Sequence, residues 1–440
     1  MFPDTYQRDE YNRIAIGGVP IRQLAEAYGT PLYVLDYATM LHRIHAFQEA
    51  LHEMTPPGRA FYAGKAFLTT AMAGFLNAHG MGLDVVSGGE LYTAIAAGFD
   101  MQNIVFHGNV KTAEEIQLAL EHNVGYVVVD SLDELHLIDE IAARMSIKAP
   151  VLLRLTPGIE AHTHAFIQTG QFDSKFGFGM KDGIHEEAVS VALASSHIDL
   201  KGFHAHIGSQ IFDEDPFVHN AMRLMEFIQS LWEQRRFWPE VLDIGGGFGV
   251  QYTQKDDPPE VPSILARVNQ AVQALTPREC EPPVIFIEPG RAIVAEAGVT
   301  VYQVNATKTV PGGKNYIAVD GGMGDNIRPA LYQAEYMAQV DGKPIDGVAL
   351  YTIAGRYCES GDILIRDVAL PPVEVGDYVV VFGTGAYNYA MSSNYNRVPK
   401  PAVVLVADGH SQLWVKRETY QDLVAQDLPW RDPAGLRDFL

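Results

Sequence analysis

The 440-residue sequence has few cysteines, a shortage of basic residues and no long apolar run, and each shortage excludes a class of protein. With only Cys280 and Cys358, the chain cannot have a disulfide framework, and a reducing compartment is expected. It has 32 Lys and Arg against 54 Asp and Glu, and this formal charge of −22 disfavours nucleic acids and anionic membrane surfaces as partners. No apolar run approaches the roughly 18 residues of a membrane span. Because the first residues, MFPDTYQRDEYNR, are too polar for a signal peptide, we expect a cytoplasmic protein.

Short β-rich segments alternate with helix-patterned segments through the first two thirds of the chain. Such alternation predicts βαβ units and a parallel sheet. Eight or nine repeats suit a (β/α)8 barrel in number and length, and a doubly wound sheet is the alternative. The β-rich segments are residues 32–36, 60–63, 83–86, 104–107, 126–130, 151–155, 202–207, 241–245 and 284–288.

The pattern changes near residue 300, where strand-like segments follow one another with Gly, Pro and Asp turns and little helix. This change predicts a second, all-β domain. We therefore expect an N-terminal segment (1–33) that packs with the β domain, a barrel (34–300) and the β domain itself (301–440).

Polar residues collect where the predicted barrel strands end. Because the carboxyl ends of all strands in a barrel meet on one face, these residues are expected to share one site. They are Lys65, Asp84, His107, Arg154, His206, Ser209, the glycines of GGGFG (245–249) and the EPGR turn (288–291).

Each of these features also has an ordinary explanation. Taken by itself, Lys65 is explained as a surface lysine whose stem lies along apolar neighbours. A single cysteine such as Cys358 is usually a small buried residue that packs in a hydrophobic core. The segment DIGGGFG is not a dinucleotide fingerprint, because Val250 stands where the third glycine belongs. The His-x-His pairs at 162–164 and 204–206 could bind a metal, but no further ligand motif accompanies them, so no metal is expected.

One ligand accounts for all these parts together. Pyridoxal 5′-phosphate forms a Schiff base with a lysine amine, and its ring nitrogen pairs with an anion. Lys65 would supply the amine, desolvated so that it loses its proton more easily. Ser209 and the glycines 245–247 suit the phosphate, Glu288 the ring nitrogen and His206 the ring face.

The chain resembles the pyridoxal-phosphate-dependent basic amino-acid decarboxylases of the alanine-racemase-like barrel, and among them the diaminopimelate decarboxylases. The resemblance runs from about residue 10 to about residue 405 and departs from the family at Arg356 and Asn388. It rests on FYAGKA, LDVVSGGEL, HGNVKT, HTHAFIQTG, KFGFG, HAHIGSQ, DIGGGFG, EPGR, IRPALY, CESGD and GAYNYAMSSNYN.

This resemblance implies decarboxylation of meso-2,6-diaminopimelate to L-lysine and CO2. It implies a homodimer with shared active sites, in which Cys358 enters the partner's barrel as the proton donor, beside Lys65 and His206 as catalytic residues. The implied cofactor-binding residues are Lys65, Asp84, Arg154, His206, Ser209, Gly245, Gly246, Gly247, Glu288, Pro289, Gly290, Arg291 and Tyr387. The implied substrate-binding residues are Arg291, Arg328, Tyr332, Glu359 and Tyr387.

Other functions on the same scaffold stay open at this point. They are an ornithine, arginine or carboxynorspermidine decarboxylase, a racemase, a non-catalytic pyridoxal-phosphate-binding protein and, more distantly, a metal-dependent amidohydrolase. Arg291 and Arg328 favour a substrate with a distal carboxylate over a simple diamine precursor, because arginine matches carboxylates with two hydrogen bonds.

Overall fold

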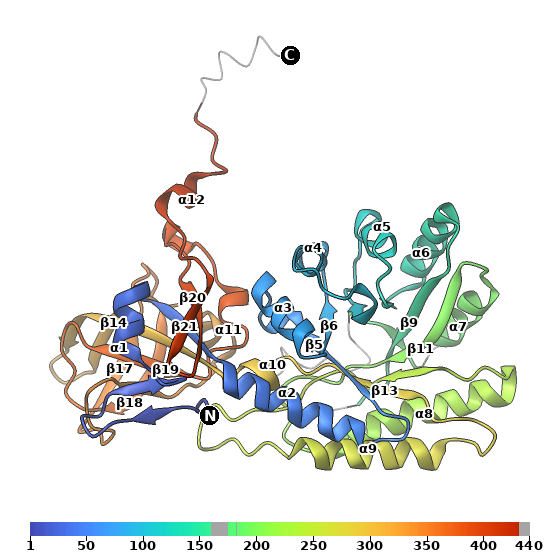
Figure 1. Cartoon of the computed structure of the whole chain (residues 1–440), viewed down its shortest axis with the longest axis horizontal. Helices are drawn as coiled ribbons and strands as arrows, with labels where there is room; N and C mark the ends of the chain where they lie inside the picture. Colours follow the sequence, from blue (N-terminus) through green and yellow to red (C-terminus); the bar gives the residue numbers. More distant parts are fainter. Residues whose placement is uncertain (160–174, 182, 431–440) are drawn as a thin grey trace, which may run out of the picture.

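A closed barrel of eight parallel strands forms the larger part of the molecule (Figure 1). The computed structural model describes residues 1–159, 175–181 and 183–430, so the HTH triplet and the HTHAFIQTG motif lie outside the described residues. Strand β8 pairs with β9 and β13 pairs with β5, which closes the barrel. The strands in order are β5 (Arg59–Ala63), β6 (Gly82–Val85), β7 (Ile104–Phe106), β8 (Tyr126–Val129), β9 (Ala149–Thr156), β11 (Ile198–His204), β12 (Val241–Asp243) and β13 (Val284–Ile287). This arrangement confirms the predicted barrel and excludes the doubly wound sheet.

Helices connect the barrel strands, and several begin at a residue suited to start a helix. The hydroxyls of Thr69, Ser87, Thr112 and Ser131 accept hydrogen bonds from the first-turn N–H groups of α3, α4, α5 and α6. The two-residue strand β10 (Phe178–Gly179) extends the sheet beside β9. The helices are α3 (Thr70–Ala78), α4 (Gly88–Ala96), α5 (Ala113–Glu121), α6 (Leu132–Met145), α7 (Ile184–Ala194), α8 (Asp215–Arg235), α9 (Val261–Leu275) and α10 (Arg291–Val294). None of the helices in the described ranges is long and apolar enough to cross a membrane.

The side chains inside the barrel form an apolar layer with a polar layer above it. The apolar layer is a separate buried cluster. Strand side chains alternate between the two faces, so the residue two positions later faces inward again. The apolar members are Phe61, Val105, Val128, Leu152, Val241 and Phe286, and the buried polar residues that follow them are His107, Asp130, Arg154, Asp243 and Glu288.

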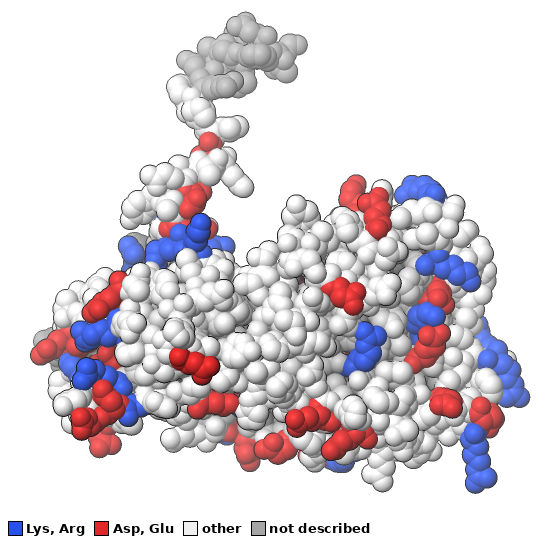
Figure 2. All heavy atoms as spheres, viewed as in Figure 1, with Lys and Arg blue, Asp and Glu red and all other residues white. Residues whose placement is uncertain are grey.

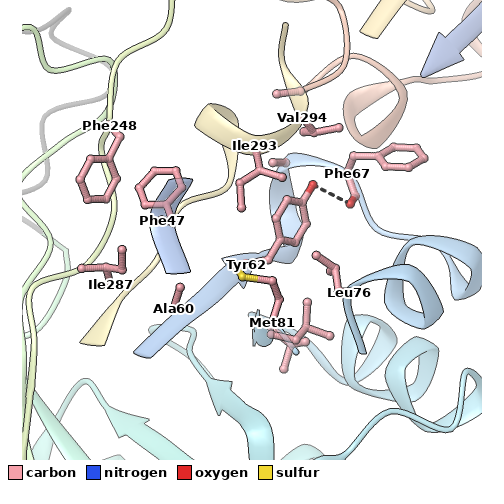
Figure 3. Close-up of a cluster of buried hydrophobic side chains, with 14 of the residues drawn as sticks. Phe47, Ala60, Tyr62, Phe67, Leu76, Met81, Phe248, Ile287, Ile293 and Val294 are labelled. Carbon is pink, nitrogen blue, oxygen red and sulfur yellow. Dashed lines mark hydrogen bonds between the residues drawn. The ribbon is translucent and has the colours of Figure 1, made fainter. Parts of the chain in front are cut away.

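The outward side of β5 supports the turn that carries Lys65. Tyr62 is fully buried, and its hydroxyl donates to the carbonyl oxygen of Phe67 at 3.0 Å (Figure 3). Leu76, Met81 and Ile293 surround the Tyr62 ring in the same view. The short turn Gly64–Ala66, which contains Lys65, is therefore held between the strand and this cluster.

The second domain is a β sheet that takes in a strand from near the N-terminus. Strand β4 (Leu32–Asp36) lies between β14, which is antiparallel to it, and β20, which is parallel to it. The expectation that residues 32–36 form a barrel strand is therefore wrong: the apolar run is a central strand of the β domain. The remaining strands are β14 (Gly298–Thr309), β15 (Asn315–Val319), β16 (Ala338–Val340), β17 (Ala349–Ala354), β18 (Ile363–Leu370), β19 (Tyr378–Phe382), β20 (Ala402–Ala407) and β21 (His410–Val415).

The N-terminal residues pack on the β domain, and a long helix leads from there to the barrel. Ile14 and Ile16 belong to the same buried cluster as Val299 and Val404. They lie in a small antiparallel sheet of β1 (Gln7–Arg8), β2 (Ile14–Ile16) and β3 (Val19–Pro20), which α1 (Ile21–Tyr28) follows. Helix α2 (Tyr37–His52) then runs from the β domain along the barrel (Figure 1). The domain limits at residues 33 and 300 stay predictions.

The charged surface carries no continuous basic field on the face drawn in Figure 2. Lys and Arg side chains stand singly or in small groups there, with acidic side chains nearby. Elsewhere in the chain's ion-pair network, Lys314 pairs with Asp367 and Arg397 with Asp427, all four side chains being exposed.

Removal of an aromatic ring from the apolar layer should destabilise the fold. Phe286 is 1% exposed, and its ring centroid lies 4.8 Å from that of Phe61. We expect Phe286→Ala to lower the free energy of unfolding by about 3–5 kcal/mol, because the cavity cannot be filled by its neighbours. Urea unfolding measures this loss, with Phe212→Ala as the control because Phe212 is 41% exposed. Equal losses in the two variants would show that this layer does not stabilise the barrel.

Candidate active site

A cavity of about 670 Å³ opens at the carboxyl end of the barrel strands, beside the β domain. Its wall contains most of the residues expected to bind cofactor or substrate. They are Lys65, His206, Ser209, Gly246, Gly247, Glu288, Pro289, Gly290, Arg291, Arg328, Tyr332 and Tyr387.

Five of the expected residues lie outside this wall. Asp84, Arg154 and Gly245 sit behind it, where Asp84 and Arg154 are 2% and 8% exposed. Cys358 and Glu359 are exposed on the β domain, and the Cys358 backbone N–H donates to Asn396 Oδ1 at 3.0 Å. A single chain therefore does not bring Cys358 to Lys65.

Lys65 faces the cavity from the turn after β5. The Lys65 side chain counts as exposed because it borders the open space of the cavity, and the walls of the cavity enclose that space. Burial lowers the pKa of the Lys65 amine, but Tyr387, Asp84 and Glu288 outweigh this effect, so the pKa lies above its usual value of 10.5. The expectation of an amine that loses its proton more easily is therefore wrong for the chain alone, because two acidic residues lie close enough to stabilise the ammonium form.

Glu288 forms the floor of the cavity and is held by two histidines. His107 Nε2 hydrogen-bonds with Glu288 Oε1, and His204 Nε2 lies 3.4 Å from Glu288 Oε2. Burial raises the pKa of Glu288, but His107 and His204 lower it by more, to well below its usual range. Burial lowers the pKa of His204 to about 3 despite Glu288, so His204 is neutral. Glu288 is thus an ionised carboxylate at a buried site.

Asp243 completes the group beneath the cavity. Burial, then the charge of Glu288, raise the pKa of Asp243 well above its usual value. Ligand atoms of His107, His204, Asp243 and Glu288 lie within 4.8 Å of one another, a set that could also hold a metal ion. The absence of a metal therefore stays a prediction, which treatment with a chelator tests.

The glycine loop after β12 allows the chain to pass very close to its neighbours. Gly245 has φ +72°, and a Cβ there would lie 2.7 Å from the carbonyl oxygen of Ala205. A Cβ on Gly246 would lie 2.3 Å from the carbonyl oxygen of Glu288. The Gly246 N–H donates to His206 Nδ1 at 3.2 Å, so the loop also fixes the imidazole. Burial, Lys65 and Arg154 lower the pKa of His206 well below its usual value, which leaves a neutral ring at the wall.

Tyr387 closes the cavity from the β domain in a strained backbone conformation. Its φ is +60°, which is uncommon for a residue other than glycine. The Tyr387 N–H donates to the carbonyl oxygen of Ala66 at 2.8 Å, beside Lys65. The Arg291 guanidinium lies 4.7 Å from the centre of the Tyr387 ring. The β domain thus contributes to the site through a contact with the lysine turn.

Sequence reasoning missed the residues that support the expected ones. His204 and Asp243 lie beside Glu288 without a predicted role there, and strand alternation was the signal that could have found them. His107 was expected at this end of the barrel, but not as a hydrogen-bond partner of Glu288. Tyr252 also lines the cavity and accepts a hydrogen bond from Arg291 Nη1 at 2.7 Å. Tyr252 lies in a loop without a motif, so no sequence signal marked it.

Comparison with known proteins shows the family of this chain. The sequence model of the "Pyridoxal-dependent decarboxylase, pyridoxal binding domain" family matches residues 38–295. Diaminopimelate decarboxylase of Bacillus subtilis (strain 168) is 48% identical over 97% of this chain and 98% of its own length. The enzyme of Staphylococcus aureus (strain COL) is 40% identical over 96% and 99%. The chain belongs to the diaminopimelate decarboxylases.

Solved structures show the same relationship. Diaminopimelate decarboxylase of M. jannaschii in complex with L-lysine superposes with a TM-score of 0.92 at 35% identity, over 98% of this chain and 99% of that one. A lysine/ornithine decarboxylase of Vibrio vulnificus has a TM-score of 0.75 at 24% identity, over 88% of this chain and 97% of that one, which shows a common fold.

Pyridoxal phosphate is the cofactor of this family, and the cavity fits it. A lysine amine faces the space, an ionised carboxylate lies at its floor, and a loop that admits only glycine lies beside a neutral imidazole. These features match in chemistry the amine, the ring-nitrogen partner, the phosphate site and the ring-face partner that the cofactor needs.

Glu90 in α4 should make stability depend on pH. Its carboxylate accepts a hydrogen bond from the Val86 N–H at 2.7 Å, and burial, then Asp84, raise its pKa to about 7. A carboxyl whose folded pKa is raised above its unfolded value of 4.5 favours the folded state less as pH rises from 4.5 to 7. Glu90→Gln keeps the acceptor and removes this titration. It should unfold like wild type at pH 4.5 and be more stable at pH 8, by up to about 3 kcal/mol.

Thermal unfolding at the two pH values tests this expectation. Glu187→Gln is the matched control, because Glu187 is exposed on α7. The titration of Glu90 would be contradicted if Glu187→Gln also became more stable than wild type at pH 8. It would be contradicted equally if Glu90→Gln were more stable than wild type by the same amount at both pH values.

Proposed function

We propose that this chain decarboxylates meso-2,6-diaminopimelate to L-lysine and CO2. The observation that carries the proposal is the cavity itself, in which Lys65 and Glu288 share one space with Arg291 and Arg328. Its place in the diaminopimelate decarboxylase family supports the same reaction, and one relative has been crystallised with L-lysine.

The cofactor end of the cavity is built by the barrel. When bound, pyridoxal phosphate supplies an aldehyde for a primary amine and a ring that takes up the electron pair left by a departing carboxylate. Lys65 would hold the aldehyde carbon, and Glu288 would keep a proton on the ring nitrogen. His206 would cover one ring face. The phosphate end would be held by Ser209, Tyr387 and the loop Gly245, Gly246 and Gly247, with Asp84, Arg154, Pro289 and Gly290 around them.

The substrate end is built by both domains. Arg291 comes from the barrel and Arg328 from the β domain, where it starts the short helix α11 (Arg328–Tyr332). We assign these two arginines and Tyr332 to the carboxylate that stays on the product, with Tyr387 near them. An ornithine-type substrate has no such carboxylate, so the pair favours diaminopimelate over ornithine and arginine.

Cys358 and Glu359 are assigned to the active site of a partner subunit. Within a single chain both side chains are exposed, and both belong to the loop CESGD (358–362), which contains glycine and acidic residues. In a two-fold dimer each subunit would give this loop and receive the same loop. The Cys358 thiol would then protonate the carbon that has lost its carboxylate, and Glu359 would contact the substrate. The homodimer and a cytoplasmic location are parts of this proposal.

Lys65→Ala should abolish turnover. Wild type with added cofactor should release lysine and CO2 from meso-diaminopimelate, with a lower kcat/KM for L-ornithine and L-arginine. The variant should release neither and should lose the absorbance of lysine-bound cofactor. Borohydride reduction followed by peptide mapping identifies the lysine that carries the cofactor. Lys111→Ala is unsuitable as a control, because Lys111 is buried in an ion pair with Glu134. Exposed Lys308→Ala is the control. Cofactor on another lysine would overturn the assignment of Lys65.

Mixing of two inactive variants should restore activity. Lys65→Ala and Cys358→Ala subunits each lack one half of the proposed shared site. Random reassortment makes about half of the dimers mixed, and each mixed dimer has one site with both residues intact, so roughly a quarter of wild-type activity should return. Mass spectrometry of differently tagged subunits checks that mixed dimers form. Mixed dimers without activity would mean that Cys358 does not act across a dimer.

A further inference from the structure

We propose that Tyr252 is a positioning residue that sets Arg291 and Arg328 side by side as a receptor for the distal carboxylate of the substrate. This inference rests on the proposed function and extends it to a residue outside the expected set. Tyr252 is 8% exposed and lies in the cavity wall.

Both guanidinium groups contact the same tyrosine. Arg291 Nη1 donates to the Tyr252 hydroxyl at 2.7 Å, and Arg291 Nη2 donates to Ser209 Oγ at 3.0 Å. The Arg328 guanidinium lies 4.9 Å from the centre of the Tyr252 ring, within the range of a cation–π contact. Arg328 Nη1 also donates to the hydroxyl of Tyr336, whose ring meets that of Tyr252 edge-on at 5.7 Å.

The partners of the two arginines are neutral. Among the described residues, the hydrogen bonds and ring contacts of Arg291 and Arg328 go to hydroxyls and tyrosine rings, and no carboxylate forms an ion pair with either. Arg291 Nε is buried and has no partner within the described chain. A phenol accepts a hydrogen bond without cancelling the positive charge, so two uncompensated charges remain for an anion.

The charges also act on the tyrosine. Burial raises the pKa of Tyr252, but Arg291 and Arg328 outweigh it and lower the pKa below the usual value of 10.0. Burial likewise lowers the pKa of Arg328, and Tyr252 and Tyr336 raise it by more. The three groups thus stabilise one another in the arrangement seen, which fixes the arginines before a ligand arrives.

The loop that carries Tyr252 is itself held in place. Asp256 Oδ2 accepts from the N–H groups of Tyr252 at 3.0 Å and Thr253 at 2.8 Å. Gln210 Nε2 donates to the carbonyl oxygen of Val250 at 2.7 Å, and Gln210 Oε1 accepts from the Val250 N–H at 3.1 Å. On the other side, Gly383 leaves room for the Tyr252 ring, since a Cβ there would lie 3.0 Å from it. The ring position is therefore set by the barrel loop and by the β domain.

The test compares ligands that differ at the distal end. L-Lysine, the product, keeps the distal carboxylate, whereas cadaverine has no carboxylate. In Tyr252→Phe holoenzyme we expect the KM for diaminopimelate and the Kd for L-lysine by calorimetry to rise roughly 10- to 100-fold, the loss typical of a hydrogen bond to a charged group. The inhibition constant of cadaverine and kcat should change by less than about threefold, because neither depends on that carboxylate.

Two further variants make the test specific. Tyr126→Phe is the matched control, because Tyr126 packs on Phe286 at the opposite end of the barrel. Tyr252→Glu places a carboxylate between the arginines and should weaken L-lysine binding more than Tyr252→Phe does, because it cancels their charge. Arg328→Ala shows how much L-lysine binding weakens when one of the two guanidinium groups is removed.

Each outcome separates this inference from the proposed function. If wild type does not convert diaminopimelate, the proposed function fails. If wild type converts it and Tyr252→Phe leaves the Kd for L-lysine unchanged, the role of Tyr252 fails alone. A loss of kcat without a change in KM, or an equal weakening of cadaverine, would also overturn it, since either would indicate a general structural role.

Discussion

The active site depends on one geometric constraint, the two-residue alternation of side chains along eight parallel strands. This alternation puts Phe61, Val105 and Phe286 in a packed layer and places His107 and Glu288 directly above it. A shift of one residue in any strand would exchange the inner and outer faces of that strand. The apolar layer thus serves as a rigid base, and the positions of the ionisable groups follow from its packing.

The polar layer is costly to bury, and its hydrogen bonds reduce that cost. An ionised carboxylate inside a protein is unfavourable unless it is paired and hydrogen-bonded. Glu288 meets this condition through its hydrogen bond with His107 and through His204, whose Nε2 lies 3.4 Å from Glu288 Oε2, whereas Lys65 faces an open cavity. The network therefore keeps the negative charge in place before any ligand enters. Arg291 and Arg328 in the cavity wall have neutral partners instead, so positive charge is left for the substrate.

Most of the barrel and of the cavity wall could be predicted from the sequence, because both depend on local patterns. Strand–helix alternation indicated the barrel, and the polar residues at strand ends indicated the wall. The placement of residues 32–36 failed, since a buried apolar run looks the same in either sheet and its partners, β14 and β20, are distant in the chain. Tyr252 could not be found because its role arises from contacts with Arg291 and Arg328. The raised pKa of Lys65 also needed the positions of Asp84 and Glu288. Cys358 and Glu359 lie exposed on the β domain, outside the cavity of their own chain.

The position of β4 between β14 and β20 has a consequence for the order of assembly during translation. A ribosome makes β4 among the first elements of the chain and β20 among the last. The sheet therefore cannot be completed until β20 has emerged, and the apolar strand Leu32–Asp36 stays unpaired on each side until β14 and β20 have been made. The barrel, which lies between these segments in the sequence, can form first. Its closure would shorten the effective loop between β4 and β14 and so reduce the entropy lost when the β domain assembles.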